Sequence, residues 1–249
     1  MKIMLTGHRG FIGSYLLNRL KKNNSVIGFD LKDGQDLLDI DFPEEFDLII
    51  HLAGKSGVRE SMKDPAGYWQ HNVEVTKRLL SRYEGTRILI ASSSSAYEPH
   101  LNPYAASKYI VEEAASCYPN TLCMRFHTVY SDVPRQGMFM QKLIDGELEY
   151  VTNHYRDFIH IDDLCDAIEL CMKSKYTGEI DIGTGLPFRI KDFAPDLPIR
   201  LNTPYERNWT CANMDRIRTL GFKPKYSVEK LLTNNKLGNI IELRNGETI

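Results

Sequence analysis

The chain has 249 residues, 42% of them hydrophobic and 26% charged, which fits one large globular unit or two small ones. Its 31 Lys and Arg residues against 33 Asp and Glu give a formal net charge of −2, so no general attraction to nucleic acid or to an anionic membrane is expected. No run of about 18 apolar residues is present, and the apolar N-terminus is typical of a strand rather than of a signal peptide.

Cysteine and histidine usage limits the redox and metal chemistry. The five cysteines form no C-x-x-C pair, and their odd number without a secretion signal is typical of reduced thiols. The seven histidines show neither H-E-x-x-H nor a cluster with cysteines. We therefore expect a cytoplasmic protein without a bound metal.

The first 22 residues predict a dinucleotide site. A buried strand is expected at Lys2–Thr6 and an apolar helix at Ser14–Lys22, joined by the glycine motif Gly7-His8-Arg9-Gly10-Phe11-Ile12-Gly13. Its first glycine permits a tight turn, its second lets the backbone approach a pyrophosphate, and its third lets the helix pack closely on the strand. The residues expected to contact the cofactor here are Gly7, Gly10, Phe11, Ile12 and Gly13.

The next predicted strand, Val26–Asp30, ends in an acid about 20 residues beyond the glycines. A carboxylate at this spacing binds the adenosine ribose hydroxyls and would repel a 2′-phosphate. Asp30 therefore favours NAD over NADP. Arg9, inside the glycine loop, argues the other way because its cation could meet that phosphate.

Two further buried strands are predicted at Phe46–His51 and Arg87–Ala91. Leu52-Ala53-Gly54 end the first of these strands, where small residues leave room for a cofactor. The serine tract Ser92–Ser95 lies at the end of the second strand. Strands and helices alternate to about residue 126, which predicts a Rossmann-like doubly wound parallel sheet. Ligands of such sheets lie at the carboxyl ends of the strands.

Tyr104 and Lys108 lie four residues apart, on one face of a predicted helix. We expect the lysine ammonium to lower the phenol pKa from about 10, so that Tyr104 can take a proton from a sugar hydroxyl. Ser93 can hold the same substrate oxygen. The same spacing recurs at Tyr226–Lys230, where no serine tract precedes it, and there it predicts only the start of a surface helix.

These motifs resemble the extended short-chain dehydrogenase/reductase family, the nucleotide-sugar epimerases and dehydratases. Further matches are Asp39-Ile40, His51–Gly54, Val58–Ser61, Asn72-Val73, Arg125-Phe126, Arg156–Asp163 and Leu220–Pro224. The resemblance implies that Ser93, Tyr104 and Lys108 are catalytic. It also implies that NAD is contacted by Tyr104, Lys108, Asp39, Ile40, Leu52, Ala53, Gly54 and Asn72. The helices that carry Asn72 and Tyr104 are expected to form a homodimer.

Within this family, the chain is similar to the UDP-glucuronate 4-epimerases at Ser92–Ser95 and at Arg125–Tyr130. The related dehydratases and decarboxylases carry an acid where Ser94-Ser95 stand, so both of those activities are disfavoured. Arg135 can grip a substrate carboxylate bidentately, and Thr128 and Ser94 can donate to it. Arg156 matches the family position that meets the substrate diphosphate, and Arg207 is a candidate for a second arginine there.

The expected activity is an NAD-dependent 4-epimerase that interconverts UDP-glucuronate and UDP-galacturonate through a 4-keto intermediate. We expect an NAD-binding domain over residues 1–130, with a strand returning near 155–185, and a small, interleaved substrate-binding lobe over residues 131–249. Three alternatives stay open: a neutral-sugar UDP-hexose 4-epimerase, a GDP-sugar epimerase/reductase, and a non-catalytic nucleotide-binding regulator. The chain is short for the group, because the stretches 30–46 and 97–104 are compressed.

Overall fold

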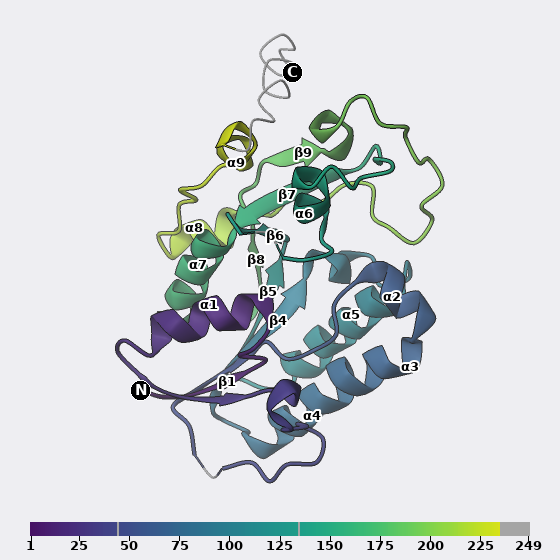
Figure 1. Cartoon of the computed structure of the whole chain (residues 1–249). Helices are drawn as coiled ribbons and strands as arrows, with labels where there is room; N and C mark the ends of the chain where they lie inside the picture. The colour runs from purple at the N-terminus through teal and green to yellow at the C-terminus, as the bar shows by residue number, and fades with distance from the viewer. Residues whose placement is uncertain (44, 134, 235–249) are drawn as a thin grey trace.

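A parallel sheet forms the centre of the molecule (Figure 1). The computed structural model describes residues 1–43, 45–133 and 135–234. The sheet has the strand order β2-β1-β3-β4-β5-β8, and every neighbouring pair is parallel. Its strands are β1 (Lys2–Thr6), β2 (Ser25–Phe29), β3 (Leu48–His51), β4 (Arg87–Ser93), β5 (Thr121–Phe126) and β8 (Gly178–Ile182). The predicted Rossmann-like sheet is therefore confirmed.

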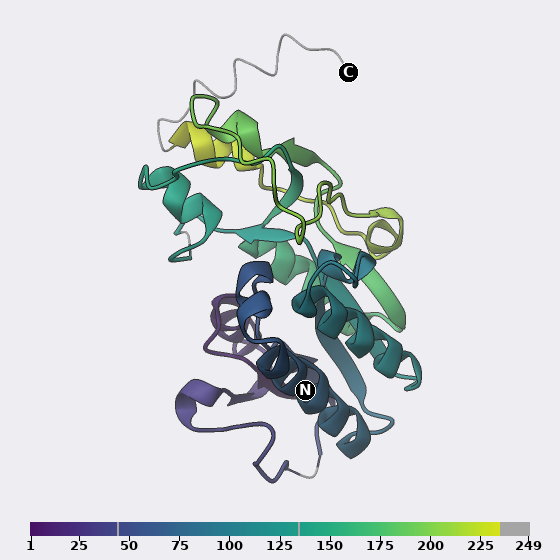
Figure 2. The same cartoon turned by 90° about the vertical axis from the view of Figure 1, so that its right-hand side faces the viewer.

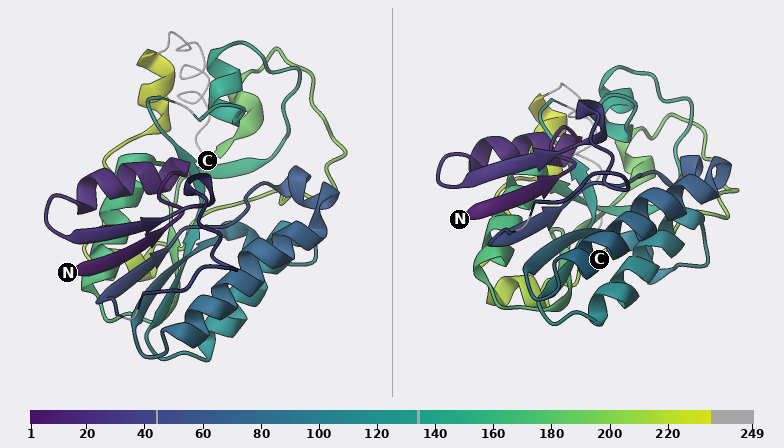
Figure 3. Two further views of the ribbon diagram at one scale, coloured as in Figure 1. Left: turned by 60° about the horizontal axis from the view of Figure 1, so that its bottom comes forward. Right: turned by 90° about the horizontal axis from the view of Figure 1, so that it is seen from below.

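Helices cover both faces of this sheet (Figure 3). The helices α1 (Phe11–Leu20) and α7 (Ile161–Lys173) lie on one face, and α4 (Val75–Arg82) and α5 (Pro103–Ser116) lie on the other. Side chains of β1 alternate between the two layers: Ile3 and Leu5 pack toward α1 and α7, whereas Met4 packs toward α4 and α5. Burial on both faces explains why the strands are nearly continuous apolar runs.

A small lobe stands over the carboxyl ends of the main sheet (Figure 2). Its sheet pairs β6 (Thr128–Tyr130) parallel to β7 (Tyr155–His160), and β7 antiparallel to β9 (Pro187–Arg189). The helices α6 (Phe139–Ile144) and α9 (Val228–Asn234) pack there, whereas α8 (Asp215–Thr219) packs against β8. The region 155–185, where a strand is expected to return to the NAD-binding domain, contains two strands. Of these, β7 belongs to the small sheet and β8 pairs in the main sheet.

Two segments differ from the predicted elements. The helix predicted over residues 65–83 is divided into α3 (Pro65–Tyr68), a π-helical turn (Trp69–Glu74) and α4, and a separate short helix, α2 (Val58–Lys63), precedes it. The sequence also predicts a short strand over residues 149–151, but the structure has none there, and Val151 makes only a single bridge to Ile199. Among the described residues, no helix combines the length and the apolar character that crossing a membrane requires.

Candidate active site

The glycine loop joins β1 to α1 and has the shape that a dinucleotide requires. Gly7 has φ +69°, a conformation that other residues rarely adopt, and a Cβ on Gly13 would clash with the Gly7 carbonyl oxygen. Gly10 is the N-cap residue of α1, and no side chain caps that helix. The N-terminus of α1 is therefore a suitable place for a pyrophosphate.

Asp30 lies beside this loop, as its spacing predicts. Its buried carboxylate accepts hydrogen bonds from the backbone N–H of Arg9 at 2.9 Å and of Lys32 at 2.9 Å. The Gly7 N–H donates to the Phe29 carbonyl oxygen at 2.8 Å, which fixes the loop against the end of β2. These residues fit the adenosine ribose and the pyrophosphate of NAD.

The end of β4 and the start of α5 bring the three predicted catalytic residues together. Asn102 caps α5 by accepting from the Ala105 N–H at 2.8 Å, which sets Tyr104 in the first turn of the helix. The Ser93 hydroxyl hydrogen-bonds the Tyr104 phenol, and Lys108 Nζ donates to the Ala91 carbonyl oxygen at 2.7 Å.

The pKa values of the two ionisable groups differ from the expectation. Burial raises the pKa of Tyr104, against which the hydrogen bond from Ser93 acts in the lowering direction. Burial also lowers the pKa of Lys108 to about 8, although Glu112 acts in the raising direction. The prediction that Lys108 lowers the phenol pKa is wrong here, because its ammonium bonds a backbone carbonyl at the end of β4 instead.

Asn72 and Gly54 form the wall beside Lys108. The Asn72 Oδ1 accepts from the Lys55 N–H at 2.7 Å, and its Nδ2 donates to the Ser107 hydroxyl at 2.9 Å. Gly54 has φ +152°, and a Cβ there would come within 2.8 Å of the Asn72 Oδ1. The π-helical turn therefore ties the end of β3 to α5, where the predicted NAD-binding residues meet.

His51, the last residue of β3, is held by hydrogen bonds at both of its ring nitrogens. Thr76 Oγ1 donates to the Asn72 carbonyl at 2.6 Å, so it accepts from His51 Nε2 at 3.1 Å. His51 Nδ1 then accepts from the Thr6 hydroxyl at 2.7 Å. Burial lowers the pKa of His51 to about 3, so its ring is neutral. Leu52 and Ala53 follow it, and the Ala53 N–H donates to the Thr6 hydroxyl.

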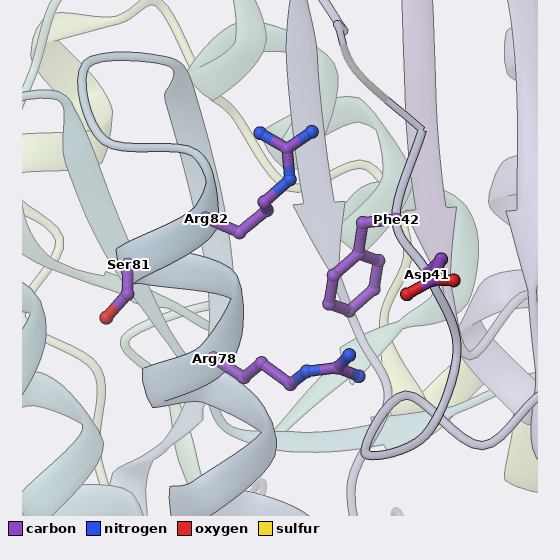
Figure 4. A pocket seen from close by; sticks show the side chains of 5 residues that line it. All are labelled: Asp41, Phe42, Arg78, Ser81 and Arg82. Atoms are coloured by element: carbon purple, nitrogen blue, oxygen red, sulfur yellow. The ribbon is translucent and has the colours of Figure 1, made fainter.

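The predicted cofactor residues Asp39 and Ile40 lie in the loop after β2. Arg78 of α4 holds this loop, because its guanidinium donates to the carbonyl oxygens of Leu37 at 2.5 Å and Ile40 at 2.7 Å. Figure 4 shows a hollow next to it, in which the Phe42 ring lies between two arginines. The residues that line the hollow are Asp41, Phe42, Arg78, Ser81 and Arg82. No predicted site residue lines it.

A pocket brings Thr128 and Arg135 together beside Phe11 of the glycine loop. Its other lining residues are Val129, Tyr130, Met138, Phe139, Met140 and Phe158. Arg135 is exposed, and among the described residues no ion pair engages it. Ser94 does not line this pocket; its carbonyl oxygen accepts from Arg207 at 2.7 Å.

Arg156 and Arg207, the two arginines considered for a substrate diphosphate, each lie beside an acidic side chain. Arg156 Nη2 lies 3.1 Å from His154 Nδ1 and 3.9 Å from Glu206 Oε2. Burial lowers the pKa of Arg156 to about 10, while Glu206 acts in the raising direction and Arg207 in the lowering direction. Arg207 lies in an irregular loop, so motif spacing alone does not assign its role. Its Nε donates to Glu98 at 2.7 Å.

Residues 3–183 match the NAD dependent epimerase/dehydratase family. The chain belongs to this family. Protein CapI of Staphylococcus aureus is 27% identical, over 92% of this chain and 95% of CapI. The structure of MoeE5 in complex with UDP-glucose and NAD has a TM-score of 0.85 at 25% identity, over 98% of this chain and 100% of MoeE5.

A second solved structure is similar over the same extent. It is UDP-glucuronic acid 4-epimerase from Bacillus cereus in complex with UDP-glucuronic acid and NAD, with a TM-score of 0.82 at 26% identity. It covers 98% of this chain and 100% of its own. The predicted family, the enzyme class and the cofactor NAD are thereby confirmed.

Proposed function

We propose that this enzyme is a UDP-sugar 4-epimerase that interconverts UDP-glucuronate and UDP-galacturonate. The observation that carries the proposal is the pocket in which the exposed Arg135 and Thr128 lie beside Phe11. A free guanidinium suits a planar carboxylate, because its forked N–H groups match both oxygens. The similarity to the Bacillus cereus enzyme, described with UDP-glucuronic acid, supports the same choice.

The chain's residues supply the proton transfer. Tyr104 removes the proton from the sugar 4-hydroxyl, and the Ser93 hydroxyl holds the oxygen as the 4-keto sugar forms. NAD, when bound at the glycine loop and Asp30, would supply the hydride acceptor and donor for carbon 4 of the sugar. Lys108 supports the nicotinamide ribose from the same face of α5. Because hydride is returned, no external reductant is consumed.

Arg135 protects the intermediate. A 4-keto uronic acid is a β-keto acid, which loses carbon dioxide when the carboxylate bond aligns with the ketone. Holding the carboxylate away from that alignment prevents the loss. Ser94 and Ser95 carry no acid that could protonate a departing hydroxyl, which supports epimerisation rather than dehydration.

The diphosphate is assigned to Arg156 and Arg207. The Arg207 guanidinium lies at the serine tract, where it donates to the Ser94 carbonyl oxygen, and Arg207 influences the pKa of Arg156. Two adjacent cations repel each other, and a diphosphate would relieve that repulsion. Glu206, which is 3.9 Å from Arg156, partly offsets it in the structure described here.

Arg135→Ala tests the substrate assignment. Loss of a charged hydrogen bond should reduce turnover of UDP-glucuronate by about 10- to 100-fold, while turnover of a neutral UDP-sugar changes little. Arg135→Lys is the matched control, since it keeps the charge without the fork and should recover only part of the rate. Turnover of each sugar is followed by chromatography of the nucleotide sugars.

An unchanged rate with UDP-glucuronate would remove the carboxylate argument. A neutral-sugar 4-epimerase would then be the better assignment; MoeE5, which is described with UDP-glucose as well as with UDP-glucuronic acid, is compatible with either sugar.

We further propose a homodimer built on the helices that carry Asn72 and Tyr104. Tyr109 on α5 and Trp69 in the π-helical turn are large exposed side chains on these helices, and their burial would stabilise a dimer. Sedimentation equilibrium of wild type and Tyr109→Asp tests it. A dimeric wild type and a weakened variant are expected, and a wild-type monomer would contradict the proposal.

A further inference from the structure

Asp33 neutralises the cationic side of the glycine loop. It lies in the 3-10 turn (Leu31–Asp33) that follows β2, and its side chain is 31% exposed. One carboxylate oxygen bonds the Arg9 guanidinium, and the other lies 3.1 Å from His8 Nε2. A single carboxylate thus engages two basic side chains of the G-x-x-G-x-x-G motif.

These basic groups surround the predicted ribose site. The Arg9 N–H donates to the Asp30 carboxylate at 2.9 Å, so the Arg9 side chain leaves the backbone beside the group expected to bind the ribose hydroxyls. Lys32 Nζ donates to the Arg9 carbonyl oxygen at 3.2 Å. The His8 ring packs on Gly28, where a Cβ would clash with it. The loop therefore concentrates positive charge where NADP, but not NAD, carries a phosphate.

Arginine is the side chain best suited to a phosphate, because its planar fork donates two parallel hydrogen bonds. In this chain that fork is already engaged by Asp33. A 2′-phosphate would have to displace a carboxylate from Arg9 and would also lie near two negative side chains, Asp30 and Asp33. Both effects disfavour NADP, and only the first depends on the Arg9 ion pair.

We propose that Asp33 is a specificity-determining residue that selects NAD by occupying Arg9. Asp30 repels the 2′-phosphate, and Asp33 removes the cation that would attract it. Replacing Asp33 by a neutral residue converts the loop toward an NADP site while Asp30 stays in place. This inference rests on the dinucleotide site of the proposed function.

The test is a competition for the purified protein. Wild type and Asp33→Asn are each dialysed against equal concentrations of NAD and NADP, and the nucleotides released on denaturation are quantified by chromatography. Asp33→Asn should raise the ratio of bound NADP to bound NAD by about tenfold, the equivalent of about 1.4 kcal/mol. Added salt should reduce this gain, because it depends on an exposed cation.

Two further variants separate specificity from general damage. Arg9→Ala in the Asp33→Asn background should remove the gain, since the phosphate then has no guanidinium to bind. Glu179→Gln is the matched control: its side chain is 35% exposed beside Arg216, and it should leave the ratio unchanged.

The outcomes distinguish this inference from the proposed function. If wild type retains NAD and Asp33→Asn leaves the ratio unchanged, the role of Asp33 is wrong while the cofactor site stands. Retention of neither dinucleotide by wild type would overturn both. A gain that persists without Arg9 would also contradict the inference.

Discussion

Tyr104 and Lys108 are positioned by different partners although they lie one helical turn apart. The phenol bonds Ser93 and lies edge-on to the Tyr68 ring at 6.0 Å, whereas the Lys108 ammonium bonds the Ala91 carbonyl. Burial opposes charge on both groups: it raises the pKa of Tyr104 and lowers the pKa of Lys108 to about 8. Burial opposes a negative charge on Tyr104, and the Ser93 hydroxyl is the neighbour that acts in favour of that charge, which supports the proposed role of Ser93.

His51 makes stability depend on pH. Its folded pKa of about 3 lies below the ordinary value of 6.5, so the unfolded chain binds the extra proton between these values. Stability is then fully present above pH 6.5 and is lost as pH falls below it. Lowering the pH from about 7.5 to 5.5 should reduce the free energy of unfolding by about 1 kcal/mol through this residue. Urea unfolding at the two pH values measures the change.

His51→Gln should remove that share of the pH dependence, although it lowers stability at the higher pH. His100→Gln, at an exposed position, is the control and should keep the wild-type dependence. Equal losses in wild type and His51→Gln would show that folding does not shift the pKa of His51.

Single residues were predictable where a short spacing defines them. The glycine motif, Asp30 and the Tyr104–Lys108 pair lie at the expected ends of strands or on the expected helix face. The partners of these residues were not predictable. Asn72 bonds Ser107 across 35 positions, and such a contact has no local sequence signal.

At the scale of elements, Glu112 fastens α5 to the main sheet. Its buried carboxylate accepts from the Ser92 hydroxyl at 2.5 Å on β4, and from Arg125 Nε at 2.9 Å and Nη2 at 2.7 Å on β5. Because Glu112 lies one turn beyond Lys108, this contact fixes the helix that carries the catalytic pair relative to Ser93.

Glu112→Gln should destabilise the protein by about 3 kcal/mol, because it leaves the Arg125 cation without its buried partner. Chemical unfolding followed by tryptophan fluorescence measures this. Glu113→Gln, at the adjacent exposed position, is the matched control and should change little. Equal stability of the two variants would mean that α5 is held by apolar packing alone.

The main strands and helices were predictable because their apolar periods are long and regular. The small sheet was not. Its strands β6 and β9 have three residues each and depend on β7 for pairing. The π-helical turn follows from the contacts of Asn72, which the helical period of 65–83 does not reveal.

At the scale of the whole molecule, one irregular loop joins the small lobe to the main sheet. Glu206 pairs with Arg59 of α2 at 2.9 Å, Arg207 donates to Glu98, and the Tyr205 carbonyl accepts from Asn102 at 2.9 Å. These contacts set the small lobe over the carboxyl ends of the strands (Figure 2). We propose that the small lobe selects the sugar and that residues at the sheet beneath it determine the reaction class.

The central claim is 4-epimerisation with hydride returned to the substrate. A proton-NMR time course of the purified enzyme with UDP-glucuronate, without added reductant, tests it most directly. The proposal predicts that UDP-galacturonate appears, and that Tyr104→Phe slows its formation by about 10²- to 10⁴-fold. Failure of the wild type to form product while NAD is bound would contradict the substrate assignment. Release of carbon dioxide with a pentose product would contradict the roles given to Arg135 and to Ser94-Ser95.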